Sequence, residues 1–300
     1  MEGTEHFAHM TKFKPYTLNI GGSLLEISRP QVMGILNATP DSFFEGSRCN
    51  TNDLIRQRVE QLLSEGADMI DVGGYSSRSM ADDISPDEEY ARLANALEIL
   101  RGIAPEAVVS VDTFRAGVAR RCVENFGVQI VNDISAGELD RDMLATVAEL
   151  KVPYIMMHMR GNPHTMMQLT DYDNLTADIL KYFSEKIKAA ELADITDIIV
   201  DPGFGFSKTL EQNYRLMAEL NVFHTLEMPL LVGISRKSMI YKLLNTTPAE
   251  SLNGTTALNT MALLQGASIL RVHDVKEAVE TVKIVNKLQD YQEQQHGIND

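Results

Sequence analysis

Eight short, mostly apolar runs of this sequence each end on a residue that can carry charge or form hydrogen bonds. The closing residues are Asn37, Asp71, Asp112, Asn132 with Asp133, His158, Asp201, Ser235 with Lys237, and Arg271 with His273. A carboxylate at the edge of an apolar core is costly unless it gains a charged or hydrogen-bonding partner. The acids and amides, with few bases nearby, therefore indicate a ligand rich in N–H donors, such as a heterocycle with an amino-pyrimidine edge. Some of the aspartates could instead cap the helices that follow them, an alternative that applies to Asp71, Asp112, Asp133 and Asp201.

A basic set follows the last two runs and points to an anion. Residues 235–238 read SRKS after the seventh run, and Arg271 and His273 end the eighth. Residues two apart on a strand lie on the same face, so Arg271 and His273 could bind one anion. In a barrel of strands and helices, the loops after strands seven and eight commonly bind phosphate. Arg271 or Arg236 could instead form a structural ion pair. Lys237 could form a Schiff base, although nothing else in the sequence requires one.

The eight runs are typical of buried parallel strands, because a continuous apolar run fits a strand that is covered on both faces. They span residues 32–37, 69–71, 108–112, 129–133, 153–158, 197–201, 229–235 and 268–273. Helices are predicted at residues 52–65, 89–101, 115–126, 141–151, 171–193, 210–220, 249–265 and 274–295, with Ser85 as an N-cap before Pro86 and Gly127 as a C-cap. This alternation predicts an α/β fold, a single TIM (β/α)8 barrel whose strand ends meet at one mouth. An open doubly wound sheet of eight strands is the alternative.

The rest of the chain is organised around this barrel. Residues 17–28 contain a glycine pair between two β-prone runs, which predicts an N-terminal β-hairpin that could cover the bottom of the barrel. No composition shift or linker divides the sequence. We therefore predict one domain over residues 16–290, with an N-terminal tail at 1–15 and a polar C-terminal tail at 291–300.

Two polar, glycine-containing loops follow the first two strands, at residues 38–49 and 73–83. Such loops on a rigid barrel are typical of lids that exclude water during a reaction. Phe43 in the first loop could stack on a flat ligand or belong to the core. Residues 203–209 read GFGFSKT, which is similar to a P-loop, but they lack the glycine directly before Lys208 and so do not predict one.

Composition excludes several classes of partner. The formal net charge of the 300 residues is −15, which argues against binding to nucleic acid or to an anionic membrane surface. Cys49 and Cys122 are far apart and lack the spacing of a zinc site or a disulfide framework. No signal peptide is recognisable at the N-terminus, and no run approaches 18 apolar residues. We expect a soluble, cytoplasmic protein.

Eight ordered motifs of the chain resemble the signatures of the dihydropteroate synthase family. They are VMGILNATPDSF (32–43), DVGG (71–74), SVDT (110–113), VNDI (131–134), MHMRGNP (157–163), DPGFGF (201–206), GISRKS (233–238) and RVHD (271–274). The resemblance runs in order from about residue 31 to residue 285. It implies condensation of a dihydropterin-methyl diphosphate with p-aminobenzoate, giving dihydropteroate and diphosphate on the route to folate.

The resemblance also implies a role for each matching residue. Asp112, Asn132, Asp201 and Lys237 would hold the pterin. Asn37, Arg271 and His273 would hold the diphosphate, with Asn37 contacting Mg²⁺, and these three with Lys237 would be catalytic. Phe43, Ser77, Arg78, Phe206 and Ser238 would shape the p-aminobenzoate side. A homodimer through the late barrel helices is implied as well. A pterin-dependent methyltransferase is the nearest rival, although it would have no use for a diphosphate site, and a non-catalytic pterin-binding barrel is a further alternative.

One loop departs from the family pattern. The usual GGESTRPG is GGYSSRSM here, at residues 73–80, so Ser77 keeps the hydroxyl of the usual threonine. Ser79 and Met80 replace a proline and a glycine, which removes a fixed φ and a permissive position. Because the resemblance implies that sulfonamides bind beside this loop, we expect altered sulfonamide affinity. Equal inhibition constants for the native protein and Ser79→Pro would contradict this expectation.

Overall fold

The structure is a computed structural model that describes residues 11, 13–39, 51–75 and 83–296. Its main sheet is made of eight parallel strands: β3 (Gln31–Asn37), β4 (Met69–Gly73), β5 (Val109–Asp112), β6 (Ile130–Asp133), β7 (Tyr154–Met157), β8 (Ile198–Asp201), β9 (Leu231–Val232) and β10 (Ile269–Val272). The order in the sheet is β8-β7-β6-β5-β4-β3-β10-β9, and a bridge between Val200 and Leu230 brings the two edges together. The sheet therefore forms a nearly closed barrel. This confirms the predicted (β/α)8 fold and not the open sheet.

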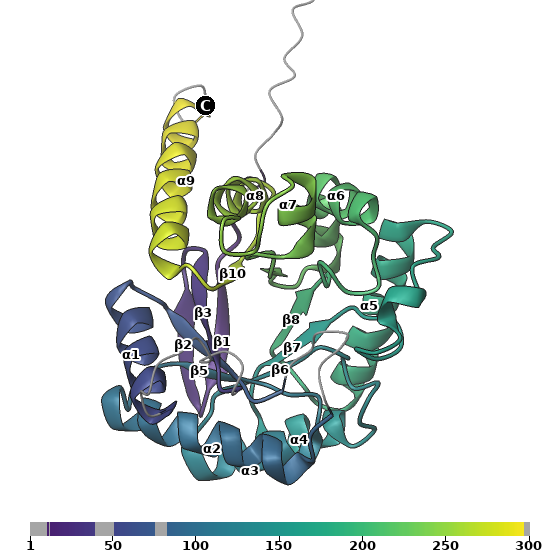
Figure 1. Ribbon diagram of the computed structural model, residues 1–300. Coiled ribbons are helices and arrows are strands. Elements are labelled where there is room, and N and C mark those ends of the chain that lie inside the picture. Colours follow the sequence, from purple (N-terminus) through teal and green to yellow (C-terminus); the bar gives the residue numbers. More distant parts are fainter. Residues whose placement is uncertain (1–10, 12, 40–50, 76–82, 297–300) are drawn as a thin grey trace, which may run out of the picture.

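Helices surround the strands (Figure 1). They are α1 (Thr51–Ser64), α2 (Pro86–Ile103), α3 (Ala116–Phe126), α4 (Met143–Leu150), α5 (Leu175–Leu192), α6 (Leu210–Ala218), α7 (Ser238–Leu243), α8 (Leu252–Leu264) and α9 (Val275–His296), with 3-10 turns at Met166–Gln168 and Leu220–Leu226. The predicted caps are confirmed: Ser85 Oγ accepts from the Glu88 N–H at 3.1 Å, and Gly127 ends α3 with φ 60°. α5 begins later than predicted, because Asn174 Oδ1 caps it by accepting from the Ala177 N–H. The six-residue α7 was not predicted.

The predicted N-terminal hairpin is present and covers the bottom of the barrel. β1 (Tyr16–Ile20) pairs antiparallel with β2 (Ser23–Ile27). Gly21 and Gly22 form the turn with φ values of 57° and 90°, which glycine adopts without a steric penalty. Leu18 and Ile27 are buried against residues at the N-terminal ends of the barrel strands. The hairpin therefore closes the end of the barrel opposite the strand ends that carry the polar residues.

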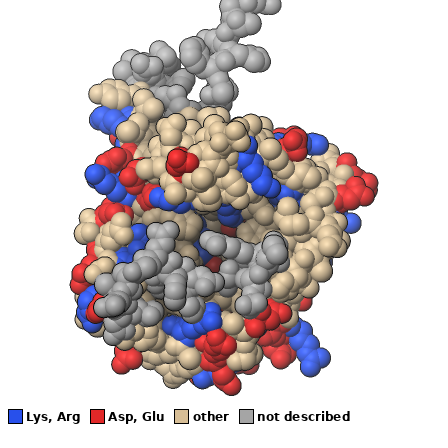
Figure 2. Space-filling view, viewed as in Figure 1, with Lys and Arg blue, Asp and Glu red and all other residues tan. Residues whose placement is uncertain are grey.

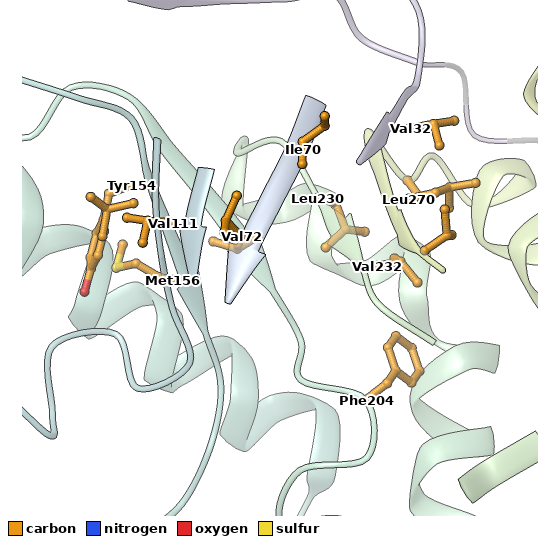
Figure 3. Packing of buried hydrophobic residues seen from close by; sticks show 14 of the residues in the cluster. Val32, Ile70, Val72, Val111, Tyr154, Met156, Phe204, Leu230, Val232 and Leu270 are labelled. Atoms are coloured by element: carbon orange, nitrogen blue, oxygen red, sulfur yellow. The ribbon is translucent and has the colours of Figure 1, made fainter. Parts of the chain in front are cut away.

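Alternation along the strands separates an outer core from the barrel interior. Outward-facing side chains, among them Val32, Ile70, Val111, Met156 and Val232, belong to one continuous cluster with the helices (Figure 3). The interior is apolar at the bottom, where Met33, Met69, Ile130, Ile155, Ile199, Leu231 and Ile269 form a cluster with the hairpin. Two residues further along four of these strands, the same face carries Asp71, Asn132, Asp201 and Arg271. An apolar floor thus lies beneath a polar layer.

Candidate active site

An arginine joins two carboxylates at the centre of the polar layer. Arg271 on β10 donates from Nε to Asp71 Oδ2 at 2.6 Å and from a terminal nitrogen to Asp112 Oδ2 at 2.7 Å. Asn132 on β6 donates its amide N–H to the same oxygen of Asp71 at 3.0 Å. These side chains come from four strands, and their alignment across the barrel follows from the parallel register of the sheet. They form the ion-pair cluster of the mouth.

Burial and charge oppose each other in this cluster. Burial raises the pKa of Asp112, while the adjacent Arg271 lowers it and the Asp71 carboxylate raises it further; the net shift is upward. Burial alone would lower the pKa of Arg271, but Asp71 and Asp112 more than compensate and raise it above its ordinary value. Arg271 is therefore a permanent cation, and Asp112 is poised to change its proton occupancy when its surroundings change.

A second acid-base pair stands on β8 and the loop after β9. Asp201 Oδ1 accepts from the Gly203 N–H at 2.8 Å, and Lys237 Nζ donates to the Phe204 carbonyl at 2.6 Å. A Cβ placed on Gly233 would lie 3.9 Å from Asp201 Oδ2 and 4.0 Å from Lys237 Nζ, so the two charged groups flank that glycine. Burial lowers the pKa of Lys237 to about 8 although Asp201 opposes the shift. Burial also raises the pKa of Asp201, against the effect of Lys237.

The aromatic ring of Phe206 and the start of α7 lie beside this pair. Lys237 Nζ is 4.7 Å from the centre of the Phe206 ring, a cation–π distance. Lys237 is also the N-cap residue of α7, so Ser238 is the first residue of that helix. The p-aminobenzoate candidates Phe206 and Ser238 therefore adjoin the pterin candidate Lys237. The other three, Phe43, Ser77 and Arg78, lie outside the described residues, as do Ser79 and Met80.

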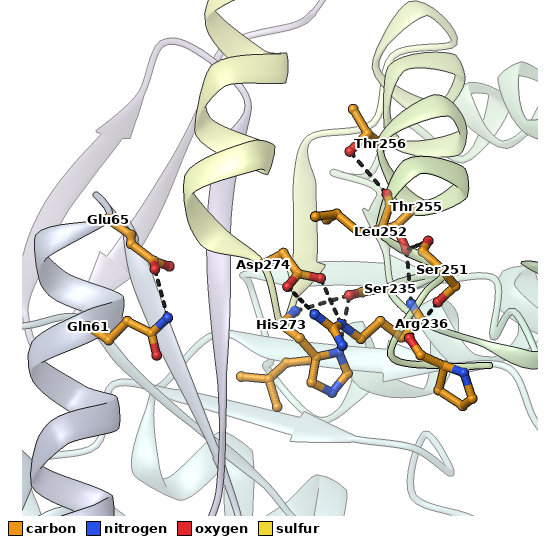
Figure 4. A network of polar contacts seen from close by, with 12 residues as sticks. Gln61, Glu65, Ser235, Arg236, Ser251, Leu252, Thr255, Thr256, His273 and Asp274 are labelled. Carbon is orange, nitrogen blue, oxygen red and sulfur yellow. Dashed lines mark hydrogen bonds and ion pairs between the residues drawn. The ribbon is translucent and has the colours of Figure 1, made fainter. Parts of the chain in front are cut away.

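A basic corner lies at the mouth beside β3 and β10. His273 Nδ1 and its backbone N–H both lie 3.1 Å from Ser235 Oγ, and Arg236 forms a two-pronged pair with Asp274 at 2.6 and 2.9 Å (Figure 4). Arg58 on α1 donates to the His273 carbonyl at 2.6 Å. Arg58, Arg236, His273 and Asp274 line a cavity of 540 Å³ together with Asn37. The face in Figure 2 is hollowed at its centre, with basic and acidic side chains inside.

Burial is also the largest influence on the pKa of the His273 imidazole. It lowers the pKa of His273 to about 4, and the nearby Arg271 acts in the same direction. The imidazole is therefore neutral near pH 7 and can donate one hydrogen bond. Arg58 was missed by sequence analysis, because an arginine on a helix surface carries no local signal. Its position becomes evident only when α1 packs beside β3 and β10.

The structure separates Arg271 from the corner that His273 occupies. Arg271 lies within β10, whereas His273 follows the last residue of that strand, Val272. The guanidinium of Arg271 pairs with Asp71 and Asp112, and Arg236 pairs with Asp274, which are the structural ion pairs considered as the alternative. Arg271 uses two of its five N–H groups in these contacts, so other donors are available to a ligand.

Two residues that end predicted strands do not belong to the mouth. Asp133 accepts from the backbone N–H groups of Ser135 and Gly137, both at 2.7 Å, and from the Tyr154 hydroxyl at 2.6 Å. It therefore organises the loop after β6 on the outer side of the barrel. His158 is buried next to Lys208, with its Nδ1 3.0 Å from the lysine Nζ.

Comparisons with known proteins show the family of this chain. The profile of the pterin binding enzyme family matches residues 33–273. The dihydropteroate synthase of Escherichia coli is 43% identical over 268 residues, covering 88% of this chain and 93% of that protein. The chain belongs to the dihydropteroate synthase family. Members of this family are transferases of folate synthesis, and the alternatives of a methyltransferase or a non-catalytic barrel are not favoured.

Solved structures of family members have the same fold. A Yersinia pestis dihydropteroate synthase in complex with a sulfonamide drug is 41% identical, with a TM-score of 0.85, over 92% of this chain and 100% of that one. The Xanthomonas albilineans dihydropteroate synthase with 4-aminobenzoic acid is 35% identical, with a TM-score of 0.85, over 92% of this chain and 99% of that one. At these identities the family relation extends to nearly the whole barrel.

Proposed function

We propose that this chain condenses 6-hydroxymethyl-7,8-dihydropterin diphosphate with p-aminobenzoate, giving 7,8-dihydropteroate and diphosphate. The observation that carries the proposal is the arrangement at the mouth. A set of buried carboxylates, with an amide and a lysine, adjoins a cavity that is lined by Arg58, Arg236 and His273, with Asp274 paired to Arg236 and two glutamates at its edge. The first set suits a flat heterocycle with several N–H donors, and the second suits an anion. A substrate that is both a pterin and a diphosphate ester matches both parts.

The pterin would be held by Asp112, Asn132, Asp201 and Lys237. Asp201 Oδ1 accepts from the Gly203 N–H, and because each carboxylate oxygen has a second lone pair, both oxygens can still accept from the 2-amino and ring N–H groups. Lys237, whose Nζ lies near the same point over Gly233 as Asp201 Oδ2, would donate to the pterin carbonyl. Two parallel hydrogen bonds to one carboxylate would fix the plane of the ring, which is the condition for placing its methylene carbon reproducibly.

The leaving diphosphate would be held by Asn37, Arg271 and His273, and we add Arg58 and Arg236 from the same cavity. Departure of diphosphate is the difficult step, because an arylamine is already a free base at neutral pH. The conjugated pterin can share the positive charge that remains on the methylene, so a dissociative, SN1-like cleavage of the C–O bond is expected. Fixed cations aimed at the departing oxygens stabilise their growing charge without reorganisation.

The residues present fit Mg²⁺ that is bound together with the diphosphate. Mg²⁺ prefers oxygen ligands, keeps several waters and commonly uses one or two protein groups plus substrate phosphates. Asn37 Oδ1 and Asp112 Oδ2 each lie 3.8 Å from the position of a Cβ on Gly73, so two protein oxygens flank one point at the mouth. Among the described residues no group of three or more His, Cys, Asp or Glu side chains is placed to hold a metal. When bound, Mg²⁺ would neutralise part of the charge on the leaving group.

A direct assay tests the proposal. Purified protein mixed with both substrates and Mg²⁺ should release diphosphate and form dihydropteroate. Asp201→Ala should lose pterin binding, and Arg271→Ala should lose turnover. A methyltransferase would release no diphosphate, and a non-catalytic barrel would bind the pterin without forming product. Absence of product from folded wild-type protein would refute the proposal.

We also propose a homodimer and a cytoplasmic location. Large apolar side chains are exposed on the late helices, namely Leu243, Met261, Ile284, Leu288 and Tyr291. A stretch of exposed apolar residues on neighbouring helices suits association with a second copy. Among the described helices none is long and apolar enough to cross a membrane. Cys122 is a buried free thiol, which is compatible with a reducing compartment.

A further inference from the structure

The loop after β8 contains a lysine that is almost wholly buried. Lys208 is 1% exposed, and its Nζ lies 2.9 Å from the Gly203 carbonyl, 3.0 Å from the Phe206 carbonyl and 3.0 Å from His158 Nδ1. These three acceptors match the three N–H groups of an ammonium. Lysine is rarely buried, because taking its charge out of water is costly. The contacts of Lys208 therefore stabilise a conformation of the loop that the loop would not adopt by itself.

The loop is strained, and two cross-contacts fasten it to the loop after β7. Gly203 has a φ of 72°, and Ser207, which has a side chain, has a φ of 51°. Ser207 Oγ accepts from the Arg160 N–H at 2.8 Å and donates to the Arg160 carbonyl at 3.1 Å. The second contact is the one between Lys208 and His158. A non-glycine residue at positive φ persists only where its surroundings impose that conformation.

The same loop supplies two groups to the pterin candidates. The Gly203 N–H donates to Asp201 Oδ1, and the Phe204 carbonyl accepts from Lys237 Nζ. Lys208 Nζ donates to the carbonyl of Gly203, and this carbonyl belongs to the peptide bond that joins Gly203 to Phe204. A Cβ on Gly203 would lie 2.1 Å from the His158 carbonyl oxygen, so the two loops are in backbone contact here. Any shift of this segment would move the partners of both Asp201 and Lys237.

We propose that Lys208 is a positioning residue for pterin binding, which rests on the proposed function. With His158 it fastens the loop of residues 203–208 to the loop after β7, so that Gly203 and Phe204 hold Asp201 and Lys237 in the orientation that the pterin requires. The basic corner is built from β3, α1 and the segments that follow β9 and β10, and the hydrogen bonds of Lys208 reach none of these. Loss of Lys208 should therefore weaken binding of the pterin and leave binding of diphosphate unchanged.

The test is calorimetric titration with two probes, 6-hydroxymethylpterin and inorganic diphosphate with Mg²⁺. In Lys208→Met the dissociation constant for the pterin should rise at least tenfold, while that for diphosphate stays within twofold of wild type. Lys188→Met, which removes an exposed lysine from α5, should match wild type for both probes. A general loss of folded protein would lower the number of binding sites for both probes equally and would not separate the two constants.

Two variants at His158 keep the test decisive if Lys208→Met does not fold. His158→Asn retains an acceptor close to the position of Nδ1, and His158→Leu removes it. Pterin binding should weaken at least threefold in His158→Leu and stay within twofold of wild type in His158→Asn. Unchanged pterin affinity in Lys208→Met, or equal affinities in the two His158 variants, would overturn the inference. Failure of the wild-type protein to bind the pterin would instead count against the proposed function.

Discussion

Replacing Arg271 with methionine should destabilise the protein strongly and in a pH-dependent way. Arg271 is the shared partner of Asp71, whose side chain is 0% exposed, and Asp112, whose side chain is 22% exposed. Removing one partner of a buried ion pair costs about 3–5 kcal/mol, because the remaining charge is left without compensation. The free energy of unfolding should therefore fall by about that amount at pH 7.5. The loss should shrink toward pH 5, because the Asp112 carboxyl, whose pKa burial raises, then takes up a proton.

Urea unfolding at the two pH values measures this effect. In Arg271→Met the native state binds more protons than the unfolded state, so its stability falls as the pH rises. The variant that also carries Asp71→Asn and Asp112→Asn removes the unpaired charges and should recover part of the loss at pH 7.5. If Arg271→Met differs from wild type by less than about 0.5 kcal/mol at pH 7.5, the ion-pair cluster does not have the energetic role inferred from its burial.

Three further predictions concern the cavity, the core and the surface. Because the pKa of His273 is lowered to about 4 in the fold, the unfolded state takes up a proton first between pH 6.5 and 4, and stability is lost as the pH falls. His273 should contribute about 3 kcal/mol to this loss of unfolding free energy. In His273→Asn the free energy of unfolding should therefore fall less steeply as the pH is lowered. Gly34→Ala should lower the free energy of unfolding in urea by about 1–3 kcal/mol, because its Cβ would lie 2.8 Å from Leu62 and 3.0 Å from Val275. The double variant Gly34→Ala with Leu62→Ala should lose less stability than the sum of the two single variants, because the smaller side chain relieves the overlap. Ile284→Glu should halve the mass measured by light scattering, and an unchanged mass would place the dimer contact elsewhere.

The order of the barrel elements could be predicted from sequence because each depends on near neighbours. Ser85 and Gly127 cap their helices with groups a few residues away, and a buried parallel strand is recognisable as an apolar run. The residues at which each strand or helix begins and ends were less predictable. The run at 229–235 predicted a seven-residue strand, whereas β9 spans Leu231–Val232. Where a strand ends depends on the neighbouring strand with which it pairs, and this pairing is not visible in a local pattern.

The sequence by itself determined the alternation of strand and helix, the polar residues at the strand ends and, through its motifs, the family. Only the tertiary structure decided which of those polar residues share a site. Asn132 faces the interior and Asp133 the outer side, because adjacent residues of a strand point in opposite directions. Arg58 reaches His273 across 215 positions of sequence, and Lys208 reaches His158 across 50. Such contacts depend on how distant elements pack, so no local pattern of residues could have revealed them.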